Sequence, residues 1–264
     1  MTDAIPEDLV RIERSGSIAT VVLNRPDKLN ALNRAMWILV AERFAELDAD
    51  ENLRCVILRG AGDKAMGPGA DISEFADYRA DSHQGAEYGA LMHSAMGAIR
   101  ACRHPVLAMI KGLCVGGALE LALMCDLRIC GSDSRFGVPI NRLGLVMAYP
   151  EIQALLGAVA PAVALEILLE GKVFDASEAL SKGLVNRMVA PGDVESETLA
   201  TAERIAQGAP LVNRWHKKFI WRVASGEAIS AEDETEGFAC FDTEDYKSGV
   251  AAFLAKTKPN FEGH

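Results

Sequence analysis

The sequence KGLCVGGALELALMCD, residues 111–126, is the stretch from which the fold of this chain can be inferred. It follows VLAMI at 106–110, an apolar run with the length and composition of a buried strand. The adjacent glycines Gly116 and Gly117 then open a segment rich in Ala, Leu and Met, which are strong helix formers. The stretch therefore predicts a buried strand that passes through a tight glycine turn into a short helix.

A single carboxylate, Glu120, stands one turn into this otherwise apolar helix. Glycine lets the backbone approach a ligand closely, and the start of a helix offers unpaired N–H groups and the positive end of the dipole. Such donors beside one acid or base are the components of a site that stabilises an enolate. A plain glycine turn followed by a first-turn Glu explains this stretch equally well when it is taken alone.

Strand and helix patterns alternate along the rest of the chain. Alternating residues at 10–14 and 18–23 predict a hairpin, and Asn30 is placed to cap a helix that extends to residue 47. A second strand that leads into a glycine loop lies at 55–72, which suggests that one supersecondary unit is used more than once. The remaining expected segments are a helix at 88–100, strands at 127–130 and 184–189, two short helices within 150–170, a helix from about 176 that ends near 183, and helix after 194. This order predicts an α/β protein with parallel strands.

The bulk properties limit the compartment and the partners. The 264 residues suffice for one large domain with an appendage, which we place at 1–195 and 196–264. A net charge of −10 disfavours nucleic acid and anionic membranes as partners, and no apolar run approaches the roughly 18 residues of a membrane span. Six cysteines without a CxxC pair and an acidic start without a signal-peptide pattern predict a reduced, cytoplasmic protein. The scattered histidines form no metal-binding pattern, so we expect no metal.

Six motifs occur together and in order along the sequence. They are NRP and NAL at 24–26 and 30–32, GADI at 69–72, GGALELA and CD at 116–122 and 125–126, FGVP at 136–139, ASEAL and GLV at 176–180 and 183–185, and FLAKTKPNF at 253–261. Over nearly the whole chain this set resembles the crotonase (enoyl-CoA hydratase/isomerase) superfamily. The resemblance implies a spiral of ββα units that forms two near-perpendicular sheets, with a C-terminal helical region that drives trimers or dimers of trimers. It also implies an acyl-CoA thioester substrate and no separate cofactor, because coenzyme A is part of the substrate.

The same resemblance assigns roles to residues of this chain. The backbone N–H groups of Ala70 and Gly117 would bind the thioester oxygen, and Glu120 would be the acid or base. The implied substrate pocket contains Gly69, Asp71, Ile72, Gly116, Ile140, Ala148 and Tyr149. Coenzyme A would be bound by Arg25, Lys28, Ala31 and Lys256. For Asp71, bracing of its own loop is the simpler interpretation, and the three basic residues are also explained as solvated surface charges.

The sequence departs from the family at the position of a second catalytic glutamate. Hydratases of the family carry it after the proline of the FGxP motif, where this chain has Ile140. Because hydration needs one group that takes a proton from water and one that gives a proton to carbon, the reaction is left open. Glu120 acts alone, or Glu151 or Asp71 supplies the second carboxylate, or the reaction needs one carboxylate only. The last class comprises isomerisation, decarboxylation and thioester hydrolysis. We take an enoyl-CoA hydratase type of enzyme as the default, with a non-catalytic acyl-CoA-binding relative as a further alternative.

Overall fold

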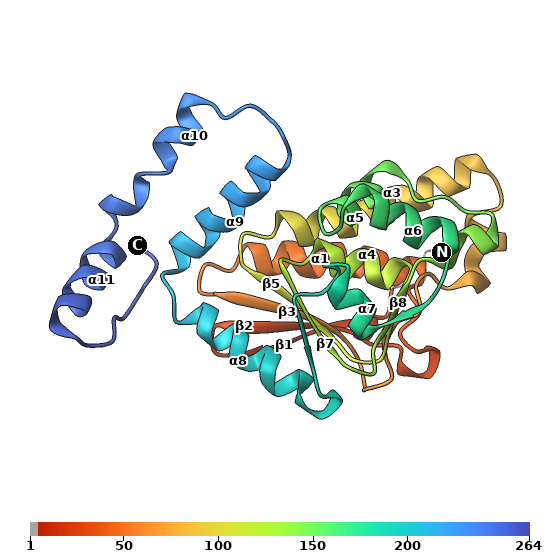
Figure 1. Ribbon diagram of the computed structural model, residues 1–264, viewed down its shortest axis with the longest axis horizontal. Coiled ribbons are helices and arrows are strands. Elements are labelled where there is room, and N and C mark those ends of the chain that lie inside the picture. The colour runs from red at the N-terminus through yellow and green to blue at the C-terminus, as the bar shows by residue number, and fades with distance from the viewer. Residues whose placement is uncertain (1–4) are drawn as a thin grey trace.

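The computed structural model of the protein describes residues 5–264, and it contains a large and a small β-sheet covered by helices (Figure 1). The six-stranded sheet has the order β1-β2-β3-β5-β7-β10, and the four-stranded sheet has the order β4-β6-β8-β9. The strands are β1 Val10–Ser15, β2 Ile18–Leu23, β3 Cys55–Gly60, β4 Ala65–Gly67, β5 Val106–Ile110, β6 Leu113–Val115, β7 Leu127–Gly131, β8 Arg135–Gly137, β9 Phe174–Asp175 and β10 Arg187–Val189.

The α-helices alternate with these strands along the chain and continue beyond β10. They are α1 Arg34–Asp48, α2 Phe75–Tyr78, α3 Ser82–Ala101, α4 Gly117–Met124, α5 Tyr149–Leu156, α6 Pro161–Glu170, α7 Ala176–Ser181, α8 Val194–Ala206, α9 Pro210–Ala224, α10 Ala231–Glu236 and α11 Glu244–Ala255. Within the described residues, no helix is long and apolar enough to cross a membrane.

The large sheet is parallel except at one edge. β1 and β2 form the expected antiparallel hairpin, and β2, β3, β5, β7 and β10 then pair in parallel. Side chains alternate between the faces, so Val56 and Leu58 of β3 join the main core while Cys55 and Ile57 face a second cluster. Because both faces are covered at the centre of the sheet, β3 and β5 are largely apolar, whereas the edge strand β1 carries polar, exposed residues. The α/β prediction is confirmed.

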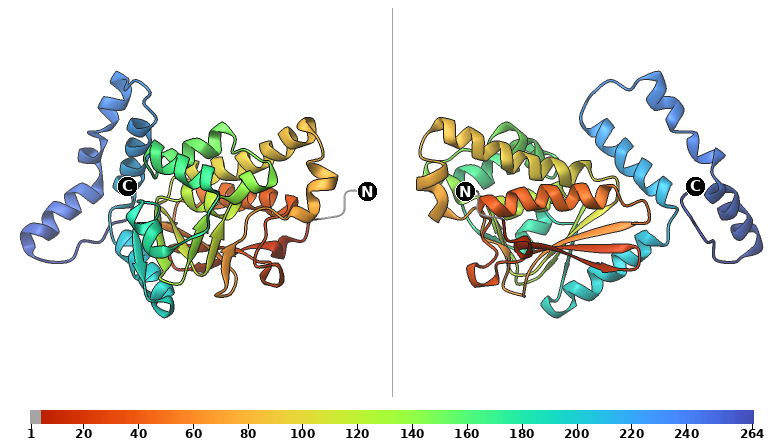
Figure 2. Two further views of the ribbon diagram at one scale, coloured as in Figure 1. Left: turned by 45° about the vertical axis from the view of Figure 1, so that its right-hand side comes forward. Right: turned by 180° about the vertical axis from the view of Figure 1, so that it is seen from behind.

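The two faces of the large sheet are covered by different parts of the chain. The main core packs α1, α3 and α4 against one face, and α8 packs on the other face against β3, β5 and β7 (Figures 1 and 2). The segment after α8 projects from the core as an arm of α9, α10 and α11 in all three views. The arm therefore begins near residue 210, while the domain boundary at 195 stays a prediction.

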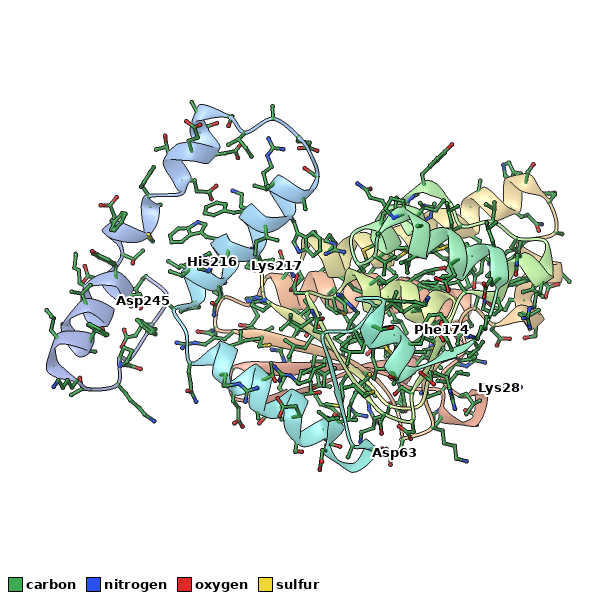
Figure 3. The ribbon with its side chains drawn as sticks, viewed as in Figure 1. Lys28, Asp63, Phe174, His216, Lys217 and Asp245 are labelled. Atoms are coloured by element: carbon green, nitrogen blue, oxygen red, sulfur yellow. The ribbon has the colours of Figure 1, made fainter. Side chains whose placement is uncertain are left out.

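A polar joint holds the arm to the core. Lys217 and Trp221 of α9 both contact Asp126, at 2.9 Å and 3.0 Å, and Asp126 also accepts a 2.7 Å bond from the Val106 N–H. Figure 3 shows Lys217 where α9 meets the core. Asp126 ends the sequence stretch from which the fold was inferred, and its role is structural.

Three predicted element boundaries differ from the structure. Helix α1 is capped by Asn33, whose side chain accepts the Met36 N–H, so the prediction for Asn30 is wrong. Asn30 is buried at a left-handed φ of 65°, and its side chain amide donates to the carbonyls of Ala61 and Ala65. Helix α3 begins at residue 82 instead of 88, and β10 at 187 instead of 184. Asn30 thus links the loop after β2 to the segment that follows β3.

Candidate active site

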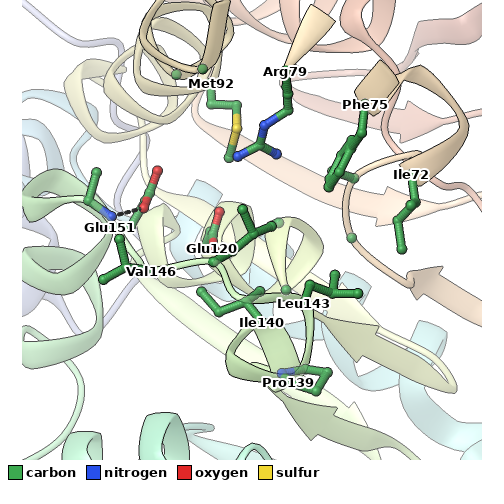
Figure 4. Close-up of a pocket in the computed structure, with 18 of the residues that line it drawn as sticks. Ile72, Phe75, Arg79, Met92, Glu120, Pro139, Ile140, Leu143, Val146 and Glu151 are labelled. Carbon is green, nitrogen blue, oxygen red and sulfur yellow. Dashed lines mark hydrogen bonds between the residues drawn. The ribbon is translucent and has the colours of Figure 1, made fainter. Parts of the chain in front are cut away.

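The small sheet places three loops around one pocket of about 460 Å³ (Figure 4). Strands β4, β6 and β8 are paired in parallel, so their carboxyl ends lie side by side. The chain leaves them at Gly69, Gly116 and Ile140, and all three residues line the pocket. Ligands bind at this end of parallel strands in many α/β proteins, because successive loops converge there. Helices α2 and α3 complete the pocket with Phe75 and residues of the face that bears His93.

Two backbone donors meet where the β4 and β6 loops touch. Gly69 and Gly116 have φ of 104° and 53°, and a Cβ at Gly69 would lie 3.3 Å from the Gly117 nitrogen. Leu32 bonds to the Gly69 carbonyl and the Asp71 N–H, so the Ala70 N–H between them points away from Leu32.

Ala70 and Gly117 both line the pocket. Gly117 is the first residue of α4, where an N–H has no acceptor within its helix. Across residues 5–264 neither N–H has a hydrogen-bond acceptor. The arrangement offers two fixed donors to one oxygen atom of a ligand.

Glu120 lies on α4 next to these donors and is only 4% exposed. Burial in the apolar pocket and, to a smaller extent, the neighbouring Glu151 together raise its pKa to about 8, and Arg79 opposes this shift. Its Oε2 has no hydrogen-bond partner among the described residues. The raised pKa favours the protonated form of Glu120 at neutral pH, and its buried Oε2 is left without a partner.

Glu151 brings a second carboxyl group to the same pocket from α5 (Figure 4). The His93 ring lies 2.9 Å from its Oε1, and its Oε2 accepts the Ala148 N–H. Since an ionised carboxylate only accepts hydrogen bonds, this double contact suits the charged form with His93 as the donor. The position near the N-terminus of α5 stabilises the same charge. Among the alternatives left open by the sequence, the geometry thus favours Glu151 as the second carboxylate.

The wall between the two glutamates is apolar. Ile140 lines the pocket together with Leu143 and Val146, which are largely exposed at its rim. An isoleucine cannot exchange a proton, and its position beside the carboxyl groups lowers the local polarity. Such an apolar wall disfavours the ionised form of a carboxyl group beside it.

The structure brings most of the predicted site residues together and excludes two. The pocket lining includes Gly69, Ala70, Ile72, Gly116, Gly117, Glu120, Ile140, Ala148 and Glu151. Tyr149 does not line it, because the side chain of this first residue of α5 points outward and is 89% exposed. Asp71 also lies outside the lining, because its carboxylate pairs with Arg25 at 3.0 Å and accepts the Ser73 N–H. Both predicted pocket assignments are corrected, and Asp71 braces its loop.

The residues expected to bind coenzyme A are spread over the molecule. Arg25 is occupied by the Ala31 carbonyl at 2.7 Å and by Asp71, so it ties the first loop to the β4 loop. Lys28 is exposed at the end of the core opposite the arm (Figure 3). Lys256 is exposed after α11, on the arm and away from the pocket of its own chain. Their contacts with coenzyme A stay predictions.

Sequence reasoning missed the wall formed by α2 and α3. Arg79, Met92 and His93 line the pocket from this side, beside Phe75. One signal was available, since Gly85 and Gly89 are four residues apart and both line the pocket. Glycines at this spacing remove side chains from one face of a helix and so leave room for a ligand.

The fold and the pocket together define an acyl-thioester enzyme of the crotonase class. Two fixed N–H donors beside a buried acid on strand–glycine-loop units are suited to an enolate. Comparison with known proteins agrees: the family model described as Enoyl-CoA hydratase/isomerase matches residues 13–264. The chain belongs to this family.

Individual relatives are similar over almost their full length. The chain is 34% identical to the short-chain-enoyl-CoA hydratase of Clostridium acetobutylicum, covering 94% of this chain and 95% of the relative. It is 34% identical to the crotonyl-CoA hydratase of Syntrophomonas wolfei, covering 95% and 96%. A crystal structure of an enoyl-CoA hydratase/carnitine racemase from Magnetospirillum magneticum matches with a TM-score of 0.96 and 50% identity, over 97% and 96% of the two chains. The predicted superfamily and fold are confirmed, and the protein is an enzyme of enoyl-CoA hydratase type.

Proposed function

We propose that the protein adds water to the double bond of a 2-enoyl-CoA thioester, and that Glu120 and Glu151 act on the substrate together. The observation that carries this proposal is the presence of both carboxyl groups in the pocket that Ala70 and Gly117 line. Relatives named short-chain-enoyl-CoA hydratase and crotonyl-CoA hydratase support a short acyl chain. The reaction needs no cofactor besides the coenzyme A of the substrate.

In the first step the thioester oxygen accepts the N–H groups of Ala70 and Gly117. The Glu151 carboxylate then takes a proton from water while the water oxygen bonds to C3 of the substrate. The electron pair of the double bond moves toward the thioester oxygen, where the two donors stabilise the negative charge. Each such donor is typically worth about 3 kcal/mol of transition-state stabilisation.

In the second step protonated Glu120 delivers its proton to C2 and completes the 3-hydroxyacyl product. Glu120 is then ionised and Glu151 is protonated, so one proton must pass from Glu151 to Glu120 before the next turnover. Water in the pocket can carry it, because the two carboxyl groups share that space. His93 keeps Glu151 directed at the pocket throughout, and it acts as a positioning residue.

The second candidate is isomerisation of a 3-enoyl-CoA by Glu120 alone. It is favoured by Ile140, which occupies the position of the family's second glutamate, and by the unpaired Oε2 of Glu120. In its ionised form Glu120 would take a proton from C2 and return it to C4, so this reaction needs the carboxylate that the raised pKa disfavours. Glu151 would then only cap α5 through the Ala148 N–H.

Product analysis separates these candidates. Purified protein is incubated with crotonyl-CoA, a 3-enoyl-CoA and malonyl-CoA, and the products are identified by mass. Hydration predicts a product 18 mass units heavier than crotonyl-CoA, whereas isomerisation leaves the mass unchanged and shifts the double bond. Binding of all three without conversion would contradict both candidates and support a non-catalytic relative.

We also propose that the arm mediates assembly into a homotrimer or a dimer of trimers. Phe238, Phe253 and Leu254 of the arm are largely exposed, which is unfavourable for an isolated chain. In such an assembly Lys256 would reach coenzyme A bound to a neighbouring subunit. Molar mass by light scattering tests this, and a monomeric mass at micromolar concentration would contradict it. The six free cysteines fit the reducing cytoplasm as the place of action.

A further inference from the structure

Arg79 is a cationic side chain in the pocket with no role in the proposed hydration. It follows α2 directly, lines the pocket, and its guanidinium stacks over the Phe75 ring at 4.6 Å and the Tyr88 ring at 5.1 Å. Figure 4 shows the guanidinium directed into the pocket beside Met92, on the side that faces Glu120. Two aromatic rings thus hold the planar group in one orientation.

No anion of the described chain neutralises this guanidinium. Within residues 5–264 Arg79 makes no ion pair and its guanidinium donates no hydrogen bond to the protein. The nearby Glu74 carboxylate instead accepts the Arg34 N–H at 2.7 Å and the Tyr88 hydroxyl at 3.3 Å. Burial raises the pKa of Glu120 and so favours its neutral form, and Glu151 is held by His93 on the far side of the pocket. A partly buried cation without a counter-ion is unfavourable unless a ligand supplies the negative charge.

We propose that Arg79 binds a carboxylate on the acyl group of the substrate, so that the enzyme selects acyl-CoA thioesters with an anionic acyl chain. This inference rests on the proposed binding of acyl-CoA in this pocket. A carboxylate accepts two parallel N–H bonds from a guanidinium, which gives both affinity and orientation. Leu143 and Val146, which lie across the pocket from Arg79 in Figure 4, offer only apolar side chains, so the negative end of the chain is directed toward Arg79.

The phosphates of coenzyme A are a second group of anions that Arg79 could bind, and the test must distinguish them from an acyl carboxylate. The phosphates of coenzyme A are present in every acyl-CoA, so a phosphate contact would give no selectivity between acyl chains. A carboxylate contact would appear only as a difference between charged and neutral acyl groups. The experiment therefore compares acyl chains of equal length on the same coenzyme A.

The test measures binding of succinyl-CoA, butyryl-CoA and free coenzyme A to the full-length protein by calorimetry. Wild type is expected to bind succinyl-CoA at least about tenfold more tightly than butyryl-CoA, as one charge-assisted pair can provide. Arg79→Met is expected to remove this preference and leave butyryl-CoA binding within about twofold of wild type. Arg79→Lys should keep part of the preference, and the surface control Arg11→Met should keep all of it.

Equal affinity of wild type for succinyl-CoA and butyryl-CoA would overturn the inference. An equal loss for all three ligands in Arg79→Met would assign Arg79 to the phosphates instead. Turnover of glutaconyl-CoA against crotonyl-CoA provides a separate readout for the reaction. If neither is hydrated while the succinyl-CoA preference persists, the hydration proposal fails and carboxylate recognition stands.

Discussion

The two sides of the pocket are built on different principles. The donor wall, residues 69–70 and 116–117, depends on backbone: two glycines with positive φ bring two loops into contact. The facing wall, residues 139–151, depends on side chains, and it combines apolar Ile140 with Glu151. Backbone donors cannot be moved without changing the fold, whereas a carboxylate can reach the same space from another position of the chain. The predicted pair of oxyanion donors can therefore be recognised from the sequence, whereas the residues proposed for proton transfer cannot.

The largest effect is expected for Glu120→Gln, which removes the proton donor without changing the shape of the side chain. We expect kcat for crotonyl-CoA to fall about 10³-fold, within the range of general acid catalysis. Binding of butyryl-CoA should stay close to wild type, because the donor wall is untouched. The matched control is Glu232→Gln, on an exposed first turn of α10. A rate within twofold of wild type would remove Glu120 from the mechanism.

A smaller loss is expected when the donor wall itself is distorted. In Gly69→Ala the new Cβ would lie 3.2 Å from the Val115 carbonyl oxygen and 3.3 Å from the Gly117 nitrogen, at a φ of 104°. One of the two loops must shift, and we expect kcat to fall about 10²-fold, as for the loss of one oxyanion donor. Gly16→Ala is the control, because its φ is also positive at 58° but nothing lies within 4 Å of the new Cβ. If kcat fell equally in Gly16→Ala, the loss in Gly69→Ala would be explained by a less stable fold and not by displaced donors.

Glu151→Gln tests the facing wall. If Glu151 takes the proton from water, hydration should fall about 10²-fold while any conversion of a 3-enoyl-CoA to a 2-enoyl-CoA persists. His93→Ala, which removes only the contact at 2.9 Å, should cost less, and His93→Gln should restore part of the loss by donating a similar bond. Hydration that is unaffected by Glu151→Gln would favour Glu120 acting alone.

The comparison of the walls also explains what the sequence could predict. The large sheet was predictable because β3 contains four consecutive apolar residues before Arg59 and β5 contains five, both with clear boundaries. The resemblance implied a second sheet, but its strands could not be located from the pattern, because β4, β6 and β8 have three residues each, too few to show a period. Yet this small sheet positions the three loops that carry Gly69, Gly116 and Ile140 to the pocket.

The site itself was predictable only where a motif fixes the backbone. The pocket positions of Ala70, Gly117 and Glu120 follow the glycine loops that the sequence displays. The outward direction of Tyr149 could not be foreseen, since it depends on where α5 begins. Arg79 and His93 come from helices whose pocket-facing side is defined only after packing.

The pH dependence of turnover should follow Glu120. Its pKa is raised to about 8, so protonated Glu120 is available below that pH and lost above it. We expect kcat for hydration to be level near pH 7 and to fall about tenfold per unit above pH 8. Constant kcat up to pH 9.5 would exclude Glu120 as the acid.

The same ionisation is linked to stability. The pKa is higher in the folded state than the ordinary value of 4.5, so the folded protein binds this proton more tightly. Its contribution to the free energy of unfolding is complete below pH 4.5 and is lost as the pH rises through 8. Glu120→Gln has no such ionisation and therefore no such loss. The urea midpoint of the variant minus that of wild type should thus be larger above pH 8 than at pH 5.

The smallest effect, and the most direct test of the comparison, is expected from moving the carboxylate back to residue 140. Ile140→Glu alone adds a third acid beside Glu120 and Glu151, which raises the cost of ionisation in the pocket. We therefore expect a gain of hydration of no more than a few-fold. In the Glu151→Gln background the same change should recover several-fold more activity, because only then is a proton acceptor missing. If Ile140→Glu helps equally in both backgrounds, Glu151 is not the functional replacement, and the two carboxylate positions are not equivalent.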